Sequence, residues 1–214
     1  MQVKDETLTN FDISKIRKLG YFSYQLLKEK EIQTISQNII TTIHDQKYRD
    51  YVWIDDFGGD HRLFGIENVL SEIAELKKNL DGVLTELYGT PIESTFLSQH
   101  VIASAGNKGS GGAFHRDSQR AQYTVFLYLT DTDLETGALQ LVDDSHKLLS
   151  KVSDCVSQKR LRIDITKPTL DPRKNISTLS VKAGGVLLCD TSCIHRGSPG
   201  IKSDRVNLTL YAYA

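Results

Sequence analysis

The pattern of apolar residues changes at Pro91, and this change limits the folds open to the chain. Before Pro91, apolar side chains recur every three or four residues, as in amphipathic helices. After it, they form short runs separated by turn residues, which is typical of antiparallel strands. The chain has 214 residues, the size of one domain. We therefore expect a single domain over 1–214, with a mostly helical part at 1–90 and a β-barrel-like sandwich at 91–214.

The N-terminal part contains two strong helical patterns. One runs between Phe22 and His44, and the clearer one runs from Glu67 to Leu87, where Gly89 and Pro91 end it. A short strand is predicted at 51–54. The glycine-containing segment 55–65 is either a lid over a functional site, with His61 or Arg62 contacting substrate, or a solvated connection, which is the usual state of such charged residues.

The C-terminal part contains six runs that predict strands. They lie at 95–104, 121–129, 137–142, 176–182, 185–190 and 205–213. The last run alternates strictly, so that its apolar side chains share one face and its polar side chains share the other. The polar set comprises Arg205, Asn207, Thr209, Tyr211 and Tyr213. This face is either exposed to solvent or forms the inner wall of a polar cavity.

Three residues suggest a metal site in this β region. His115 and Asp117 are two residues apart, so an extended backbone projects both side chains to one side. His195 follows an apolar run at a predicted strand end, and the long separation suits a jelly roll. Two imidazoles and one carboxylate hold Fe(II) on one face and leave the other open. Arg205, ten residues after His195, supplies a guanidinium suited to the carboxylate of a small di-acid.

Two other interpretations of these residues are less satisfactory. The histidines can be ordinary surface or capping residues. Alternatively, Cys189 and Cys193 can join His195 and His115 in a tetrahedral zinc site. That spacing lacks the usual paired-cysteine knuckle, however, and it leaves Asp117 and Arg205 without a role.

The same segments resemble the phytanoyl-CoA dioxygenase-like branch of the Fe(II)/2-oxoglutarate oxygenases. The likeness spans about residues 95–214 and is carried by GGAFHRDS (111–118), YTVFLYLTD (123–131), ETGALQL (135–141), SHK (145–147) and the segment 184–205. One departure is Asp144, which stands where the family's turn before Ser145-His146 usually has glycine.

The resemblance implies a fold that is mainly β with N-terminal helices: a double-stranded β-helix (a cupin-like jelly roll) with a helical layer packed on it. It also implies Fe(II) bound by His115, Asp117 and His195, with 2-oxoglutarate and O2 as co-substrates. In the family an arginine matching Arg205 holds the distal carboxylate of 2-oxoglutarate. The metal site thus coincides with the one that the residue types suggest.

Three further residues are weaker candidates for co-substrate binding: Ser198, Thr124 and Gln99. Ser198 can equally be a plain turn residue beside Pro199, and Thr124 a plain β-branched strand residue. Gln99 precedes the glycine-rich loop and is a similar case. Asn207 and Tyr211 share the face of Arg205 and are candidates to line the same cavity.

The implied reaction is hydroxylation of an unactivated C–H bond, with release of succinate and CO2. The substrate is expected to be a small metabolite or a carrier- or sugar-linked intermediate. Relatives that halogenate carry a small residue at the position of Asp117, so its carboxylate favours hydroxylation or a related oxidation. The alternatives are a cupin-like isomerase or epimerase that uses its histidines as general bases without iron, and a non-catalytic binding protein.

Composition narrows the partners further. The net charge of −1 gives no electrostatic case for nucleic acid, and no apolar run reaches membrane-spanning length. The N-terminus lacks the apolar core of a signal peptide, and the three cysteines favour free thiols, so we expect a cytoplasmic protein. Substrate choice depends on the N-terminal helices and on segments 55–65 and 145–175, none of which carries a legible motif. The sequence does not indicate the oligomeric state.

Overall fold

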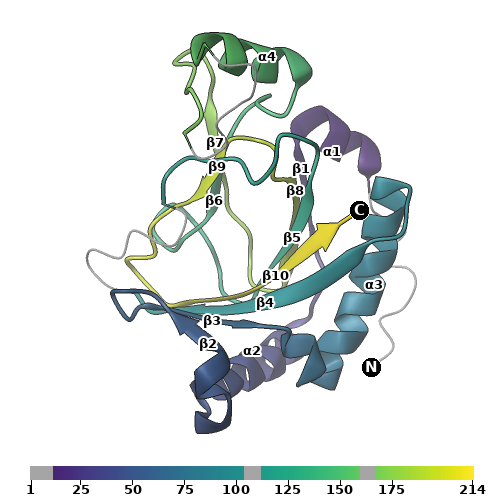
Figure 1. Ribbon diagram of the computed structural model, residues 1–214. Helices are drawn as coiled ribbons and strands as arrows, with labels where there is room; N and C mark the ends of the chain where they lie inside the picture. Colours follow the sequence, from purple (N-terminus) through teal and green to yellow (C-terminus); the bar gives the residue numbers. More distant parts are fainter. Residues whose placement is uncertain (1–11, 104–111, 160–166) are drawn as a thin grey trace.

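Two antiparallel sheets face one another, and helices cover the outside of the larger one (Figure 1). The computed structural model describes residues 12–103, 112–159 and 167–214. Most of the glycine-rich segment before His115 and part of the 145–175 segment therefore lie outside the described residues. The arrangement is the predicted jelly roll, although its sheets do not close into a continuous barrel.

Within the described residues, the larger sheet has seven strands in the order β1-β8-β5-β10-β4-β3-β2, and the smaller has three in the order β7-β6-β9. The strands are β1 (Tyr21–Gln25), β2 (Val52–Ile54), β3 (Asp60–Phe64), β4 (Glu93–Val101), β5 (Tyr123–Tyr128), β6 (Leu139–Val142), β7 (Ile176–Leu179), β8 (Gly185–Asp190), β9 (His195–Gly197) and β10 (Arg205–Tyr213). All six strands predicted after Pro91 are present, within a few residues of the expected bounds.

Three helices pack against the outer face of the larger sheet: α1 (Ile13–Leu19), α2 (Glu29–His44) and α3 (Ser71–Tyr88). Short 3₁₀ turns, η2 (Gln46–Tyr51) and η3 (Ile66–Asn68), precede β2 and α3. Helix α3 ends at Gly89, whose φ of 71° is left-handed, as the sequence predicted. Helix α4 (Leu148–Ser157) lies beside the smaller sheet (Figure 1). None of the helices in the described ranges is long and apolar enough to cross a membrane.

Strand β10 sorts its side chains between two environments. Val206, Leu208, Leu210 and Ala212 are buried in the core beneath the helices. The alternate residues Arg205, Asn207, Thr209 and Tyr211 line a cavity between the two sheets. The second of the two interpretations of this polar face is therefore confirmed for these four residues.

The N-terminal part differs from the expectation of a mostly helical segment. Residues predicted to begin a helix at Phe22 instead form β1, which pairs with β8, and the helix begins at Glu29. The β-prone aromatic residues of 21–25 gain more from the sheet edge than from one more helical turn. The segment Asp60–Phe64 is likewise neither a lid nor a solvated connection, because it forms β3 between β2 and β4.

Candidate metal centre

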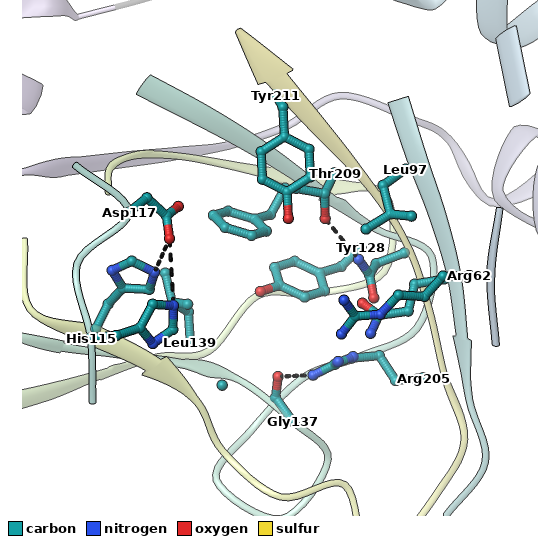
Figure 2. A pocket seen from close by; sticks show the side chains of 15 residues that line it. Arg62, Leu97, His115, Asp117, Tyr128, Gly137, Leu139, Arg205, Thr209 and Tyr211 are labelled. Carbon is teal, nitrogen blue, oxygen red and sulfur yellow. Dashed lines mark hydrogen bonds and ion pairs between the residues drawn. The ribbon is translucent and has the colours of Figure 1, made fainter. Parts of the chain in front are cut away.

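His115, Asp117 and His195 converge in the cavity wall, as the sequence predicted. Figure 2 shows His115 and Asp117 at one end of the cavity. One ligand atom from each residue lies within 4.8 Å of the other two. The Nε2 atoms of His115 and His195 lie 3.4 and 3.7 Å from Oδ1 of Asp117. His195 is buried, whereas the side chains of His115 and Asp117 are 30% and 25% exposed. The group can therefore hold a metal ion and still be reached from the cavity.

Both histidines present the same nitrogen to this point. Nδ1 of His115 lies 2.9 Å from the carbonyl oxygen of Ala113, and Nδ1 of His195 lies 2.9 Å from that of Cys193. A carbonyl oxygen only accepts hydrogen bonds, so each neutral ring carries its proton on Nδ1 and keeps the Nε2 lone pair for a metal.

The electrostatics of the three groups differ. The hydrogen bond with Asp117 raises the pKa of His115 against the opposing effect of burial. Burial lowers the pKa of His195. Burial acts to raise the pKa of Asp117, but the contacts with His115 and His195 in their protonated forms outweigh it, and the net shift is downward. Asp117 is therefore an ionised ligand at neutral pH.

The backbone fixes the relative positions of the ligands. His115 and His195 form an antiparallel bridge with N–O distances of 2.9 and 2.8 Å, and the amide of Asp117 donates to the carbonyl of Thr191. Arg116, between the two ligands, points the opposite way and is buried. Its guanidinium donates to the carbonyls of Ser145 and Ser192. This alternation anchors the ligand segment from behind, a role that the sequence analysis did not assign.

The cysteine alternative is not supported by the site. The grouped ligand atoms include neither Cys189 nor Cys193. Burial raises the pKa of Cys193 to about 12 and that of Cys189 well above its ordinary value. Both side chains are therefore protonated thiols, whereas zinc binds thiolates.

Arg205 lies at the opposite end of the cavity (Figure 2). Its Nη1 donates to the carbonyl of Gly137 at 2.6 Å, and its Nε is buried without a hydrogen-bond partner. Gly137 has a φ of 91°, and a Cβ there would collide with Arg205. The absence of a side chain at 137 thus allows the guanidinium to lie against this turn. No carboxylate among the described residues forms an ion pair with it.

A second guanidinium, that of Arg62, lies near Arg205 but is neutralised. Its Nε and Nη2 donate to the fully buried carboxylate of Asp60, with Nη2 at 2.9 Å, and its plane lies over Trp53. Gln99 donates to the same carboxylate at 2.8 Å. Asp60 and Arg62 had been placed in a loop, so the sequence analysis missed this cluster. The signal that could have found it is the two-residue spacing of Asp60 and Arg62, which places both side chains on one face if 60–64 is a strand.

The space between the two ends holds about 190 Å³. Its walls come from both sheets, with Leu97 and Phe126 from the larger and Leu139 from the smaller. Tyr128 and Tyr211 add phenol groups (Figure 2), and burial raises the pKa of each to about 12. Asn207 donates to Thr209, and its Oδ1 is buried without a partner. The cavity therefore offers neutral polar groups between a cation site and an anion site.

The weaker candidates occupy different places. Gln99 lines the cavity, as do Asn207 and Tyr211. The Oγ1 of the buried Thr124 lies 3.2 Å from that of Thr191, and the hydroxyl of Ser198 donates to the carbonyl of Asp133 at 3.4 Å. Neither residue is part of the cavity wall, and their binding roles stay predictions.

Comparison with known proteins gives one family and many similar folds. Residues 26–205 match the model of the phytanoyl-CoA dioxygenase family. No curated protein matches the sequence. Among solved structures, the chain is similar to the non-heme alpha-ketoglutarate-dependent epimerase SnoN from nogalamycin biosynthesis. The TM-score is 0.70 at 14% identity, covering 97% of this chain and 83% of that one.

Two further structures show the same likeness. EctD from S. alaskensis with bound Fe has a TM-score of 0.70 at 16% identity, over 94% of this chain and 75% of that one. HygX from Streptomyces hygroscopicus, with nickel, 2-oxoglutarate and hygromycin B bound, has a TM-score of 0.64 at 12% identity, over 94% and 85%. At these identities the likeness establishes the fold alone.

Proposed function

The chain belongs to the phytanoyl-CoA dioxygenase family, and from that premise we propose that it is a non-haem Fe(II)- and 2-oxoglutarate-dependent dioxygenase that hydroxylates a small molecule. The observation that carries the proposal is the pairing of two complementary ends in one cavity. His115, Asp117 and His195 can hold a metal ion, and Arg205 offers an uncompensated guanidinium opposite them.

Both groups fit the residues that would hold them. Two neutral imidazoles and an ionised carboxylate form the ligand set that suits Fe(II) and leaves positions open. Arg205 has a buried Nε without a partner, which matches a ligand that brings its own acceptor, such as the distal carboxylate of 2-oxoglutarate. When bound, iron and 2-oxoglutarate supply oxidation of a C–H bond coupled to decarboxylation of the oxo acid to succinate and CO2.

The chain's own residues would bind the metal ion, orient its ligands and line the space between the two ends. Asp117 stays ionised and faces the two Nε2 atoms, while the Nδ1 protons of the histidines remain on backbone carbonyls. Leu97, Phe126 and Leu139 limit water between the two ends. Tyr128 stays neutral because its pKa is about 12, so it adds no negative charge near Arg205. These features favour a di-anion that spans from the metal to the guanidinium.

Hydroxylation is the outcome that we favour within this class. The Asp117 carboxylate occupies the position that halogenating relatives leave small. Similar structures, however, include an alpha-ketoglutarate-dependent epimerase, SnoN, and an alpha-ketoglutarate-dependent carbocyclase, SnoK. The reaction is therefore assigned by product analysis, with gain of one oxygen atom expected in the product.

The test is an anaerobic titration of metal-free protein with Fe(II) and 2-oxoglutarate, followed by the visible charge-transfer band of the chelate. We expect the band in the wild type and its loss in His115→Ala/Asp117→Ala. His44→Ala, which removes an exposed histidine outside the cavity, is the matched control and should keep the band. A folded wild-type protein that gives no band contradicts the proposal. Activity that persists with a chelator would favour the iron-free isomerase instead.

A further inference from the structure

The cavity side of the larger sheet continues past the cavity onto β3 and β2, the last two strands of that sheet (Figure 1). Two rows of cross-strand paired residues lead onto these strands. One row is Thr209–Leu97–Phe64, and the other is Gln99–Arg62–Trp53. Directly paired residues share a face of the sheet. In each row the first two residues line the cavity and the third lies beyond it.

The two residues at the outer ends of the rows are exposed aromatic residues. Phe64 is 59% exposed and Trp53 is 49% exposed, whereas Leu97 is buried. Their strand neighbours face the other way, since Leu63 is buried in the core beneath the helices and Val52 packs against that core. Among the described residues, the smaller sheet therefore leaves this extension of the cavity wall open to solvent. Its four members, Trp53, Arg62, Phe64 and Leu97, form a ledge beside the cavity.

The charge on this ledge is already neutralised. Arg62 donates from Nε and Nη2 to the carboxylate of Asp60, and Gln99 donates to the same carboxylate. The Arg62 guanidinium also lies over the Trp53 ring, with Cζ 5.0 Å from the ring centroid. This cation–π contact stabilises the position of the indole. The ledge therefore presents mainly apolar, aromatic surface without a net charge.

We propose that the ledge binds an uncharged, planar aromatic ring of the substrate, which presupposes the proposed dioxygenase function. Aromatic rings attract one another in offset or edge-to-face packing, and Trp53 and Phe64 supply two rings with few rotatable bonds to immobilise. Figure 2 shows Arg62 and Leu97 on the side of the cavity opposite His115 and Asp117. Because Arg62 and Leu97 belong to both the ledge and the cavity, a ring held here directs the rest of the molecule across the cavity toward the metal end.

The chemistry of the ledge disfavours sugars and anions. A sugar brings several hydroxyl groups, and burying hydroxyls without hydrogen-bond partners costs free energy. The donors nearest to hand, on Arg62 and Gln99, are directed at Asp60. An anion would have to compete with that carboxylate, which is fully buried. An uncharged ring needs neither kind of partner.

A second copy of the chain is the other candidate occupant, because β2 is an edge strand. The strand has only three residues, however, and a very short edge strand offers little backbone for pairing with another chain. The continuity of the ledge with the cavity favours a small molecule that enters both.

Trp53 is the only tryptophan in the sequence, so its emission reports on the ledge. The probe is N-phenyl-1-naphthylamine, an uncharged aromatic compound that accepts energy from excited tryptophan. We expect saturable energy transfer from Trp53 to the probe in the full chain. Phe64→Ala should weaken probe binding about fivefold, because it removes one of the two exposed rings. Leu149→Ala, which removes an exposed apolar side chain on α4, is the matched control and should leave probe binding unchanged.

Three outcomes overturn the proposal. The first is a wild-type protein without saturable energy transfer, and the second is equal probe affinity in Phe64→Ala and the wild type. The third is displacement of the probe by methyl glucoside but not by 2-naphthol, which would assign the ledge to a sugar. Size-exclusion chromatography adds a check, since self-association that excludes the probe would assign the ledge to a second copy and contradict the proposal.

The chelate band separates this proposal from the proposed function. Phe64 lies outside the cavity, so Phe64→Ala should keep the band that the wild type gives with Fe(II) and 2-oxoglutarate, which also shows that the variant folds. A folded wild-type protein without the band contradicts the dioxygenase function. A normal band in a protein that does not bind the probe contradicts the ledge alone.

Discussion

The two ends of the cavity are built in opposite ways. The metal end combines an anionic Asp117 with two imidazoles held by an isolated backbone bridge, and the side chains of His115 and Asp117 remain partly exposed. The guanidinium end lies within the larger sheet, where Asp60 neutralises Arg62 and leaves Arg205 with only a carbonyl. The metal end therefore attracts a cation, because Asp117 supplies a negative charge there. The guanidinium end attracts an anion, because Arg205 contacts a carbonyl and has no carboxylate partner among the described residues.

Burial makes the second end the more sensitive of the two. Electrostatic interactions strengthen as solvent is excluded, so a lost partner costs more at Asp60 than at an exposed ion pair. The two ends of the cavity should also act independently, since the candidate metal ligands and the guanidinium pair share no hydrogen bond among those found in the described residues.

Asp60→Ala should produce the largest change. It leaves the Arg62 guanidinium and the Gln99 amide facing a partly buried void, and breaking such a pair typically costs about 3 kcal/mol. We expect a loss of that size in the free energy of unfolding, measured by urea denaturation, with Fe(II) affinity retained. Asp131→Asn, which breaks an exposed pair with Lys182, is the control and should have no measurable effect. Equal effects of the two variants would contradict the contrast.

Arg205→Ala should separate the two ends functionally. Removing a buried guanidinium from a carboxylate costs at least about 2 kcal/mol, so the Kd for 2-oxoglutarate should rise at least roughly 30-fold. Fe(II) binding should not change, because the metal ligands are untouched. The Kd of Arg205→Lys should lie between those of the wild type and Arg205→Ala, since lysine keeps the positive charge but lacks the two-pronged hydrogen-bonding geometry of the guanidinium. If the alanine variant binds 2-oxoglutarate as tightly as the wild type, the anion site is elsewhere.

Gly137→Ala should have a similar but smaller effect. The new Cβ collides with the Arg205 guanidinium and also strains a backbone with φ of 91°. We expect the Kd for 2-oxoglutarate to rise about tenfold, the equivalent of about 1.4 kcal/mol, with the iron chelate band otherwise normal. Gly82→Ala on α3, where the added methyl meets no atom within 4 Å, should leave the affinity unchanged. A shifted metal affinity in Gly137→Ala would argue against independent ends.

Tyr128, between the two ends, should affect stability only at high pH. Burial raises its pKa from 10.0 to about 12, so above pH 10 the unfolded chain loses a proton that the folded protein retains. The stabilisation is fully present below pH 10 and is lost as the pH rises toward 12. Tyr128→Phe should reduce this alkaline loss in denaturation curves, whereas Tyr213→Phe, at an exposed position, should not. Identical alkaline curves for Tyr128→Phe and the wild type would refute the assignment.

Local patterns were sufficient for the metal end and for most of the β region. The spacing of His115 and Asp117 predicts that both side chains project to one side, because side chains alternate along an extended backbone. Arg116, between them, follows the same alternation and is buried on the opposite side. The alternation in β10 placed its apolar residues in the core and allowed the polar ones to be a cavity wall. Helix α3 was equally accessible, because its apolar stripe and its terminal Gly89 are both local signals.

Pairing between strands that are distant in the sequence decided the structure of two segments that local patterns left open or predicted wrongly. Whether Tyr21–Gln25 begins a helix or joins β8, and whether Asp60–Phe64 is a loop or a strand, depends on edges supplied by residues far along the chain. The sequence by itself predicted the candidate ligands, the arginine opposite them and the jelly-roll pattern, since these follow from residue types, strand alternation and the family resemblance. Only the tertiary structure placed the Asp60–Arg62 pair beside Arg205, and brought His44 to His61 and His100. Contacts of this kind follow from strand register and helix packing, which no local spacing encodes.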